Sequence, residues 1–277
     1  MSKRGAAFFD LDKTLMQGSS AFEFGRAAYR AGLMSRRQLA ADAIANIRFR
    51  LRGASDDTSA ALRDRIAVAL TGVRVRDLER LGVGVLAGVL PRLYPQMLQI
   101  AYDHQDAGRP VYIVTAAAQE LAEMLAQVTA FDGGLGSNFS EVVDGHYTGK
   151  PAGAFLYGEE KANALREIAA REGLDLGESY AYSDSASDLP MLRAVGHPVV
   201  VNPDAELEKL ARDSGWDVLR LDALGRQLWA GAGVITAALV GGVVALVLFG
   251  REREAERERQ RRARERRGLR RLAARRD

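Results

Sequence analysis

The sequence contains no cysteine, which excludes disulfide bonds and cysteine-ligated metal sites. The absence of cysteine is also typical of a protein in a reducing compartment. Histidine is scarce too. The three histidines are widely separated and have no metal-ligand spacing, so we interpret them as structural residues: His104, His146 and His197.

Two further signals are missing. The first residues, Met-Ser-Lys-Arg-Gly, run directly into an apolar segment, so the sequence predicts no secretory leader. Gly133, Gly134 and Gly136 predict a loop, but this loop lacks the Gly-Lys-Ser/Thr ending of a nucleotide-binding loop, so no ATP site is expected. Because no secretory leader is predicted, we expect the folded body of the protein to lie in the cytoplasm.

The charge is unevenly distributed. The net charge is +3, but the segment from Arg251 to Asp277 contains 13 Arg, five Glu and one Asp, a net of +7 that leaves −4 for the rest of the chain. Such a tail could attract phosphate-rich partners, of which we favour anionic lipid over nucleic acid. The tail is compatible either with a continuing helix or with a solvated charge run.

Short apolar runs alternate with helical patterns along most of the chain. The predicted strands are Ala6–Asp10, Val111–Thr115, Ser179–Ser183, Pro198–Val201 and Val218–Leu221. The predicted helices between them are Leu121–Val128, Lys161–Arg171, Leu189–Val195 and Ala205–Asp213. Alternation of this kind favours a parallel sheet covered on both faces. Gly145 and Gly149 flank a predicted small hairpin between Val142 and Leu156.

About 100 residues separate the first two strands, too many for a single crossover. They show helical periodicity over Ser20–Leu33, Ser35–Leu51, Thr58–Thr71 and Val75–Leu90. We expect a helical cap that excludes water and selects the substrate. The predicted fold is α/β, a Rossmann-like three-layer parallel sheet with a helical cap insert and a C-terminal transmembrane or membrane-embedded helix. The predicted boundaries are 1–16 and 92–225 for the core, 17–91 for the cap, 227–250 for the membrane helix and 251–277 for the Arg-rich tail.

Polar residues suited to phosphoryl transfer occur at four places, three of which follow an apolar strand. They are Asp10 with Asp12, Thr115, Lys161, and Asp184 with Asp188. Binding sites of open parallel sheets lie beyond the carboxyl ends of the strands. Together these residues supply a carboxylate nucleophile, a carboxylate for proton transfer, a hydroxyl and an ammonium for phosphate oxygens, and acidic ligands for Mg²⁺.

Each of these residues also has a more ordinary interpretation by itself. In an extended chain Asp10 and Asp12 would share one face and reach one phosphoryl group, but Asp-x-Asp is also common where a strand ends. Thr115 could cap a helix, Lys161 could be a solvated helix residue, and Asp188 could cap the next helix. The combination of four sites in fixed order favours the chemical interpretation.

The residues Phe9-Asp10-Leu11-Asp12-Lys13-Thr14-Leu15 resemble the first motif of the haloacid dehalogenase superfamily, in the subfamily that includes phosphoserine phosphatases. Thr115 is similar to the hydroxyl of the second motif and Lys161 to the lysine of the third. Asp184 and Asp188 resemble the acidic pair of the fourth. The resemblance covers roughly Lys3 to Leu221.

The resemblance implies a role for each residue. Asp10 would be the nucleophile and a Mg²⁺ ligand, and Asp12 the general acid and base with its main-chain carbonyl on the metal. Thr115 and Lys161 would bind the oxygens of the transferring phosphoryl group.

The fourth motif completes the metal site by the same resemblance. Asp184 would bind Mg²⁺ directly, and Asp188 would hold a metal-bound water or orient Lys161. Carboxylate and carbonyl oxygens are suitable ligands for Mg²⁺, which keeps several of its waters.

Some residues bear on the reaction and the substrate. Related ion-pumping ATPases have Thr in place of Asp12, and a carboxylate there favours hydrolysis over a stored intermediate. Phosphoserine phosphatases follow the second-motif hydroxyl with a Gly pair, whereas this chain has Ala116-Ala117. The basic cap residues Arg26, Arg30 and Arg48 are candidates for binding the substrate only because of their charge.

An uncharged run of 22 residues, Leu228–Phe249, is long enough to cross a bilayer. A buried core helix is the alternative, although such helices are usually shorter and have a polar face. Trp229 suits an interfacial position. Small residues recur every four positions and could pair two such helices in a homodimer: Gly233, Ala237, Gly241 and Ala245.

The orientation of this segment conflicts with the charge of the tail. If Leu228–Phe249 spans the membrane, the Arg-rich tail lies outside, against the tendency of basic residues to stay inside. We therefore slightly favour a segment that enters the bilayer without crossing it, with the tail on anionic headgroups. The predicted location is the cell membrane, with the catalytic domain in the cytoplasm.

Two functions remain open at this point. The first is a Mg²⁺-dependent phosphomonoester hydrolase that acts through an aspartyl-phosphate intermediate on a small phosphorylated metabolite similar to phosphoserine, or on a lipid phosphate. The second is a membrane-tethered regulatory or binding protein that uses the same fold to sense a ligand. Asp12 favours the enzyme, because binding alone needs no proton transfer.

Overall fold

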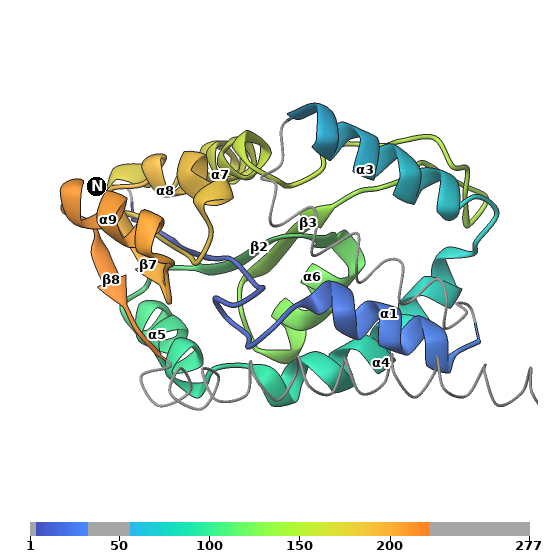
Figure 1. Cartoon of the computed structure of the whole chain (residues 1–277), viewed down its shortest axis with the longest axis horizontal. Helices are drawn as coiled ribbons and strands as arrows, with labels where there is room; N and C mark the ends of the chain where they lie inside the picture. Colours follow the sequence, from blue (N-terminus) through green and yellow to red (C-terminus); the bar gives the residue numbers. More distant parts are fainter. Residues whose placement is uncertain (1–3, 33–55, 222–277) are drawn as a thin grey trace, which may run out of the picture. The chain divides into compact units, whose positions relative to one another are not determined.

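The computed structural model describes residues 4–32 and 56–221 (Figure 1). They belong to a compact unit that ends at Leu221. Its centre is a six-stranded parallel sheet in the order β3-β2-β1-β6-β7-β8. The strands are β1 (Ala7–Phe9), β2 (Val111–Ala118), β3 (Gly133–Ser137), β6 (Tyr180–Ser183), β7 (His197–Val201) and β8 (Asp217–Leu219).

Helices cover both faces of the sheet. On one face, Phe9 and Ile113 pack with α5 (Pro95–Asp106) and α6 (Gln119–Val128). On the other face, Phe8 and Val114 pack with α7 (Glu159–Glu172), α8 (Leu189–Arg193) and α9 (Ala205–Asp213). In Figure 1, α7 and α8 lie above the sheet and α5 lies below it. Adjacent residues of β1 alternate between the two faces, and both faces are buried, as a covered parallel sheet requires. The predicted three-layer α/β fold is confirmed.

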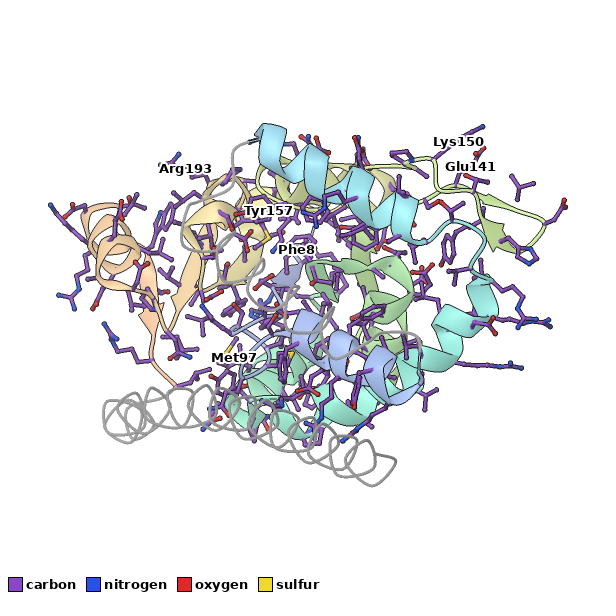
Figure 2. The ribbon with its side chains drawn as sticks, turned by 45° about the vertical axis from the view of Figure 1, so that its right-hand side comes forward. Phe8, Met97, Glu141, Lys150, Tyr157 and Arg193 are labelled. Carbon is purple, nitrogen blue, oxygen red and sulfur yellow. The ribbon has the colours of Figure 1, made fainter. Side chains whose placement is uncertain are left out.

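The labelled side chains of Figure 2 illustrate the two environments. Phe8 and Met97 lie fully buried inside the molecule, whereas Glu141 and Lys150 lie at the surface beside the hairpin. The hairpin consists of β4 (Val142–Val143) and β5 (His146–Tyr147), and it confirms the hairpin predicted from the glycines.

One prediction for this part of the chain is wrong. Gly133, Gly134 and Gly136 do not form a loop but belong to the edge strand β3. A Cβ atom on Gly134 would lie 2.2 Å from the carbonyl oxygen of Ala122, and one on Gly136 would lie 2.7 Å from Cα of Gln119. These glycines therefore allow α6 to pack directly against the strand.

The insert between β1 and β2 is helical where the structure describes it. It contains α1 (Ser20–Arg30), α3 (Asp56–Ala69) and α4 (Val75–Val89), close to three of the predicted helices. The fourth predicted helix, Ser35–Leu51, lies entirely among residues that the structure does not describe. Residues 222–277 are likewise outside the description, so the apolar segment, its pairing stripe and the Arg-rich tail stay predictions. Across residues 4–32 and 56–221, no helix has both the length and the apolar character needed to cross a bilayer.

The insert is joined to the core by two linkers that pair with each other. Met16 forms an antiparallel bridge with Leu93, and the N–H of Gln17 donates to the carbonyl of Arg92 over 2.8 Å. The N–H of Tyr94 donates to the carbonyl of Leu15 over 2.9 Å. The chain thus leaves and re-enters the core at one place, and α1 begins directly beyond it.

Candidate active site

The sheet register brings three of the predicted sites to one edge. Phe9 pairs with Ile113 of β2 on one side and with Tyr182 of β6 on the other. Asp10, the next residue, donates its N–H to the carbonyl of Tyr182 over 2.9 Å. Because the strands are parallel, the residues that follow them lie at the same edge. Asp10 therefore lies between the β2 segment that contains Thr115 and the loop after β6 that contains Asp184.

The centre of the site is a buried ammonium between two carboxylates. Lys161, in the first turn of α7, donates from Nζ to Oδ1 of Asp10 over 2.6 Å and to Oδ2 of Asp188 over 2.7 Å. The exposed fraction is 3% for Lys161, 6% for Asp10 and 2% for Asp188. Buried charges persist only when they are paired in this way. The prediction that Lys161 is more than a solvated helix residue agrees with this geometry.

The electrostatics of this cluster are unbalanced. Burial raises the pKa of Asp10 to about 8; Lys161 opposes the rise, while Asp188 and Asp184 add to it. For Lys161, burial lowers the pKa, but Asp10 and Asp188 outweigh burial and raise it above its ordinary value. The lysine is thus held as a cation, whereas burial and the two neighbouring carboxylates disfavour the ionised form of Asp10.

Asp188 is held in place by Ser183 as well as by Lys161. Oγ of Ser183 donates to Oδ2 of Asp188 over 2.7 Å and accepts from the N–H of Ser185 at 3.2 Å. Asp188 precedes α8, but its side chain makes no capping hydrogen bond there. The interpretation of Asp188 as a helix cap is therefore wrong, and its contact with Lys161 agrees with the predicted orienting role. The sequence analysis missed Ser183, although it directly precedes Asp184 in a buried strand.

Asp12 has a different environment from Asp10. Strand β1 ends at Phe9, so the alternation of side chains along a strand does not reach Asp12, and the argument that both carboxylates share one strand face is wrong. Oδ2 of Asp12 accepts from Oγ of Ser19 over 2.8 Å, and Oδ1 accepts from the N–H of Ser20 over 2.7 Å. No sequence motif pointed to these two serines as partners of Asp12.

The turn after β1 places Lys13 beside the fourth motif. Lys13 has a φ of 59°, in the left-handed region that a non-glycine residue rarely adopts. Its Nζ lies 3.5 Å from Oδ2 of Asp184, with half of the lysine side chain exposed. Such local strain is often found at functional sites, where the surrounding structure maintains it.

Thr115 is buried at the same edge. Its Oγ1 accepts from the N–H of Ala117 at 3.2 Å. Strand β2 continues beyond Thr115 to Ala118, so Thr115 does not cap the helix that follows. Of the basic cap residues, Arg26 and Arg30 are exposed on α1, and Arg48 lies outside the described residues. For Arg26 and Arg30, no described contact joins the side chain to the site.

The oxygen atoms at this site are compatible with a magnesium ion, but the four aspartates of the site would not all bind it through their carboxylates. In residues 4–32 and 56–221, no three acidic or histidine side chains gather around one point. The resemblance implies that the ligands would be the carboxylates of Asp10 and Asp184 and the main-chain carbonyl of Asp12, and Asp10 and Asp184 follow neighbouring strands at one edge of the sheet. A usual magnesium site has one or two carboxylates and takes its other ligands from water. Burial and the neighbouring carboxylates Asp188 and Asp184 disfavour the ionised form of Asp10, and a bound divalent cation would offset this effect. The roles of these residues stay predictions.

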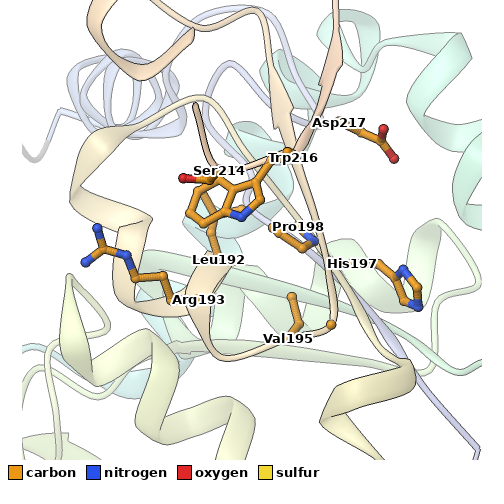
Figure 3. A pocket seen from close by; sticks show the side chains of 10 residues that line it. Leu192, Arg193, Val195, His197, Pro198, Ser214, Trp216 and Asp217 are labelled. Carbon is orange, nitrogen blue, oxygen red and sulfur yellow. The ribbon is translucent and has the colours of Figure 1, made fainter. Parts of the chain in front are cut away.

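A separate pocket of about 380 Å³ lies away from this cluster. It is lined by residues at the starts of β7 and β8 and by Trp216, as Figure 3 shows. Because the strands are parallel, this pocket is at the amino-end edge of the sheet. None of the predicted site residues lines it, so it is not the predicted active site.

Comparison with known proteins shows the family of the chain. Residues 7–193 match the family model described as haloacid dehalogenase-like hydrolase. The chain is 40% identical over 215 residues to the phosphoserine phosphatase SerB1 of Mycobacterium tuberculosis, covering 77% of this chain and 70% of that protein. It is 30% identical over 220 residues to a histidinol-phosphatase of Neisseria meningitidis, covering 78% and 98%.

Solved structures have the same fold. A Bordetella pertussis protein of unknown function matches with a TM-score of 0.69 and 26% identity, over 79% of this chain and 100% of that one. A phospho-aspartyl intermediate analogue of phosphoserine phosphatase matches with a TM-score of 0.58 and 18% identity, over 83% and 99%. The chain is therefore an enzyme of the haloacid dehalogenase-like hydrolase family, similar to its phosphatases.

Proposed function

We propose that the protein is a Mg²⁺-dependent phosphomonoester hydrolase that forms an aspartyl phosphate, a mixed anhydride, at Asp10. The observation that carries this proposal is the buried cluster of Asp10, Lys161 and Asp188 at the carboxyl end of β1. The ammonium of Lys161 fixes one oxygen of Asp10 and places positive charge where a phosphate must approach. Membership of the hydrolase family supports the same reaction.

The reaction proceeds in two steps. An oxygen of the Asp10 carboxylate attacks phosphorus, the bond from phosphorus to the leaving oxygen breaks, and Asp12 gives its proton to that oxygen. A water molecule then attacks the phosphoryl group on Asp10, Asp12 takes a proton from the water, and the bond from phosphorus to Asp10 breaks. Thr115 and Lys161 hold the oxygens of the phosphoryl group in both steps.

Magnesium would be held by the carboxylates of Asp10 and Asp184 and by the carbonyl of Asp12. When bound, it supplies positive charge that draws the anionic phosphate toward an anionic nucleophile. Asp188 keeps Lys161 in position, and Ser183 keeps Asp188 in position.

The substrate is a small phosphorylated metabolite or a lipid phosphate. The relatives are named for two different substrates, so their names support a phosphomonoester without choosing one. The predicted apolar segment Leu228–Phe249 would bring the enzyme to a membrane and favour the lipid phosphate.

The proposal is tested with 4-nitrophenyl phosphate, Mg²⁺ and the full chain. Wild type should turn over and lose activity with chelator, and Asp10→Asn should lose at least ~10³-fold in kcat because it removes the nucleophile. Its melting temperature should stay near that of wild type, because Lys161 keeps Asp188 as a partner. Mass spectrometry of acid-quenched turnover should find a phosphoryl group on the peptide that contains Asp10.

The same experiment addresses the regulatory alternative. A protein that only senses a phosphorylated ligand would bind phosphate without turnover in either variant. Equal rates from wild type and Asp10→Asn, or a phosphoryl group on another residue, would overturn the proposed function.

A further inference from the structure

We propose that Ser19, at the start of the cap helix α1, is a positioning residue that holds Asp12 as the general acid for leaving-group protonation. This inference rests on the proposed function, since it concerns the proton donor of the same reaction. It assigns to the cap helix a role in the reaction that acts through Asp12.

The contacts between Asp12 and α1 involve both carboxylate oxygens. Ser19 donates from Oγ to Oδ2 over 2.8 Å, and the main-chain N–H of Ser20 donates to Oδ1 over 2.7 Å. Two hydrogen bonds to the two oxygens of one carboxylate fix the plane of that group as well as its position. Ser19 is the N-cap residue of α1, but its side chain makes no capping bond to its own helix. Its hydroxyl is thus directed to the core rather than to the helix that it begins.

The two donors differ in what they can do when Asp12 changes protonation state. A main-chain N–H can only donate, whereas a serine hydroxyl can donate to a carboxylate and accept from a carboxylic acid by rotating its hydrogen. A group that must first give a proton and then take one needs a neighbour that fits both forms. Between these two donors, the hydroxyl of Ser19 has this property and the main-chain N–H of Ser20 does not.

Other contacts hold the start of α1 in place and therefore hold Ser19 beside Asp12. Gly18 has a φ of 93° and turns the chain from the linker into the helix. One turn further, Glu23 is 3% exposed and forms an ion pair with Arg92 on the returning linker, with 3.1 Å between Nε and Oε1. A Cβ atom on Gly88 would lie 2.2 Å from Oε2 of Glu23, so α4 leaves room for this carboxylate. The position of Ser19 is therefore fixed by the same contacts that join the cap to the core.

The experiment measures how kcat/KM depends on the leaving group. With 4-nitrophenyl phosphate the leaving group departs without a proton, whereas with phenyl phosphate it needs one, and both esters have nearly the same shape. Asp12→Asn should lower kcat/KM for phenyl phosphate by ~10²-fold or more relative to 4-nitrophenyl phosphate. Ser19→Ala should lower the same ratio by about 10-fold, as expected for the loss of orientation alone.

Three further variants make the result specific. Ser19→Thr keeps a hydroxyl and should restore the wild-type ratio. Ser20→Ala deletes a neighbouring buried hydroxyl but keeps the main-chain N–H that meets Asp12, so it should also keep the wild-type ratio. The double variant Asp12→Asn with Ser19→Ala should have the ratio of Asp12→Asn, because both changes act through one group.

The outcomes separate the two proposals. If Ser19→Ala lowers kcat/KM equally for both esters, or if the two changes multiply in the double variant, Ser19 does not position the acid and the inference is overturned. Loss of turnover in Asp10→Asn would still support the proposed function in that case. If Asp10→Asn keeps wild-type turnover, the proposed function itself fails.

Discussion

Two serines at opposite ends of β6 show how the two edges of the sheet differ. Ser179 and Ser183 are both fully buried, and each hydroxyl donates one hydrogen bond and accepts another. At the amino end, Ser179 accepts from the N–H of Ala6 and donates to the carbonyl of Asp175, so both partners are neutral main-chain groups. At the carboxyl end, Ser183 donates to the carboxylate of Asp188.

The difference extends beyond these two serines. The described residues contain two buried polar side-chain atoms without a hydrogen-bond partner, Oγ1 of Thr14 and Nδ2 of Asn202. Both residues lie in segments that follow carboxyl ends of strands, β1 and β7. Unpaired buried polar atoms and crowded carboxylates both cost stability. The amino-end edge therefore contributes mainly to the fold, and the carboxyl-end edge gives up stability for the site.

The largest effect should come from removing the cation of the site. In Lys161→Met, two buried carboxylates lose their shared partner, so the free energy of unfolding should fall by roughly 3–5 kcal/mol and activity should disappear. The loss of stability should increase as pH rises. Without Lys161, the buried carboxyl groups stay protonated in the folded state but ionise in the unfolded state, so rising pH favours unfolding. Urea unfolding at several pH values measures this.

The matched control for Lys161 lies on the same helix. Arg166 is exposed and pairs with Glu159 over 2.8 Å, so Arg166→Met should change stability very little. Equal losses for Lys161→Met and Arg166→Met would show that burial at the carboxyl end is not what makes this lysine important.

The second prediction compares the two serines directly. Ser179→Ala leaves the N–H of Ala6 and the carbonyl of Asp175 without this partner and should cost about 1–3 kcal/mol with unchanged kcat. Ser183→Ala should cost less stability, because Asp188 keeps Lys161, but it should lower kcat by about 10-fold through the position of that lysine. Unfolding curves and steady-state rates of both variants are the measurement. The reverse pattern would contradict the division between the two edges.

The sequence was most informative where an apolar run ends in polar residues. Asp10, Thr115 and Asp184 follow buried segments, so the parallel register alone brings their strands together. The prediction of Lys161 depended on the other motifs, because nothing in its own helix shows that its side chain turns inward. Its two carboxylate partners lie 151 and 27 residues away in sequence.

Other features could not be obtained from local patterns. Strand β3 contains three glycines in five residues, and its formation depends on the close packing of α6. The partners of Asp12 come from the insert, whose orientation relative to the core is set by the paired linkers at Met16 and Leu93. Neither relation has a periodic signature in the sequence.

The smallest predicted effect concerns a buried titratable group away from the site. His104 is 5% exposed; Nε2 lies 2.8 Å from the hydroxyl of Tyr182, and Nδ1 accepts from Nε of Arg109 over 2.8 Å. The pKa of His104 is lowered to about 4, mainly by burial and also by Arg109, while Asp103 opposes the shift. The imidazole is thus held neutral, which agrees with its interpretation as a structural residue.

The sign of the pH dependence follows from this shift. Between pH 6.5 and about 4 the unfolded chain binds a proton at His104 and the folded chain does not, so this contribution to stability is complete above pH 6.5 and is lost as pH falls. From pH 7.5 to 5.5, wild type should lose about 1 kcal/mol more than His104→Gln, which keeps a hydrogen-bonding side chain but cannot titrate. Urea unfolding of both proteins at the two pH values measures the difference. Parallel pH profiles would show that this buried histidine does not resist protonation. The contrast between neutral hydrogen-bond partners in the fold and charged partners in the site would then hold only for Ser179 and Ser183, at the two ends of β6.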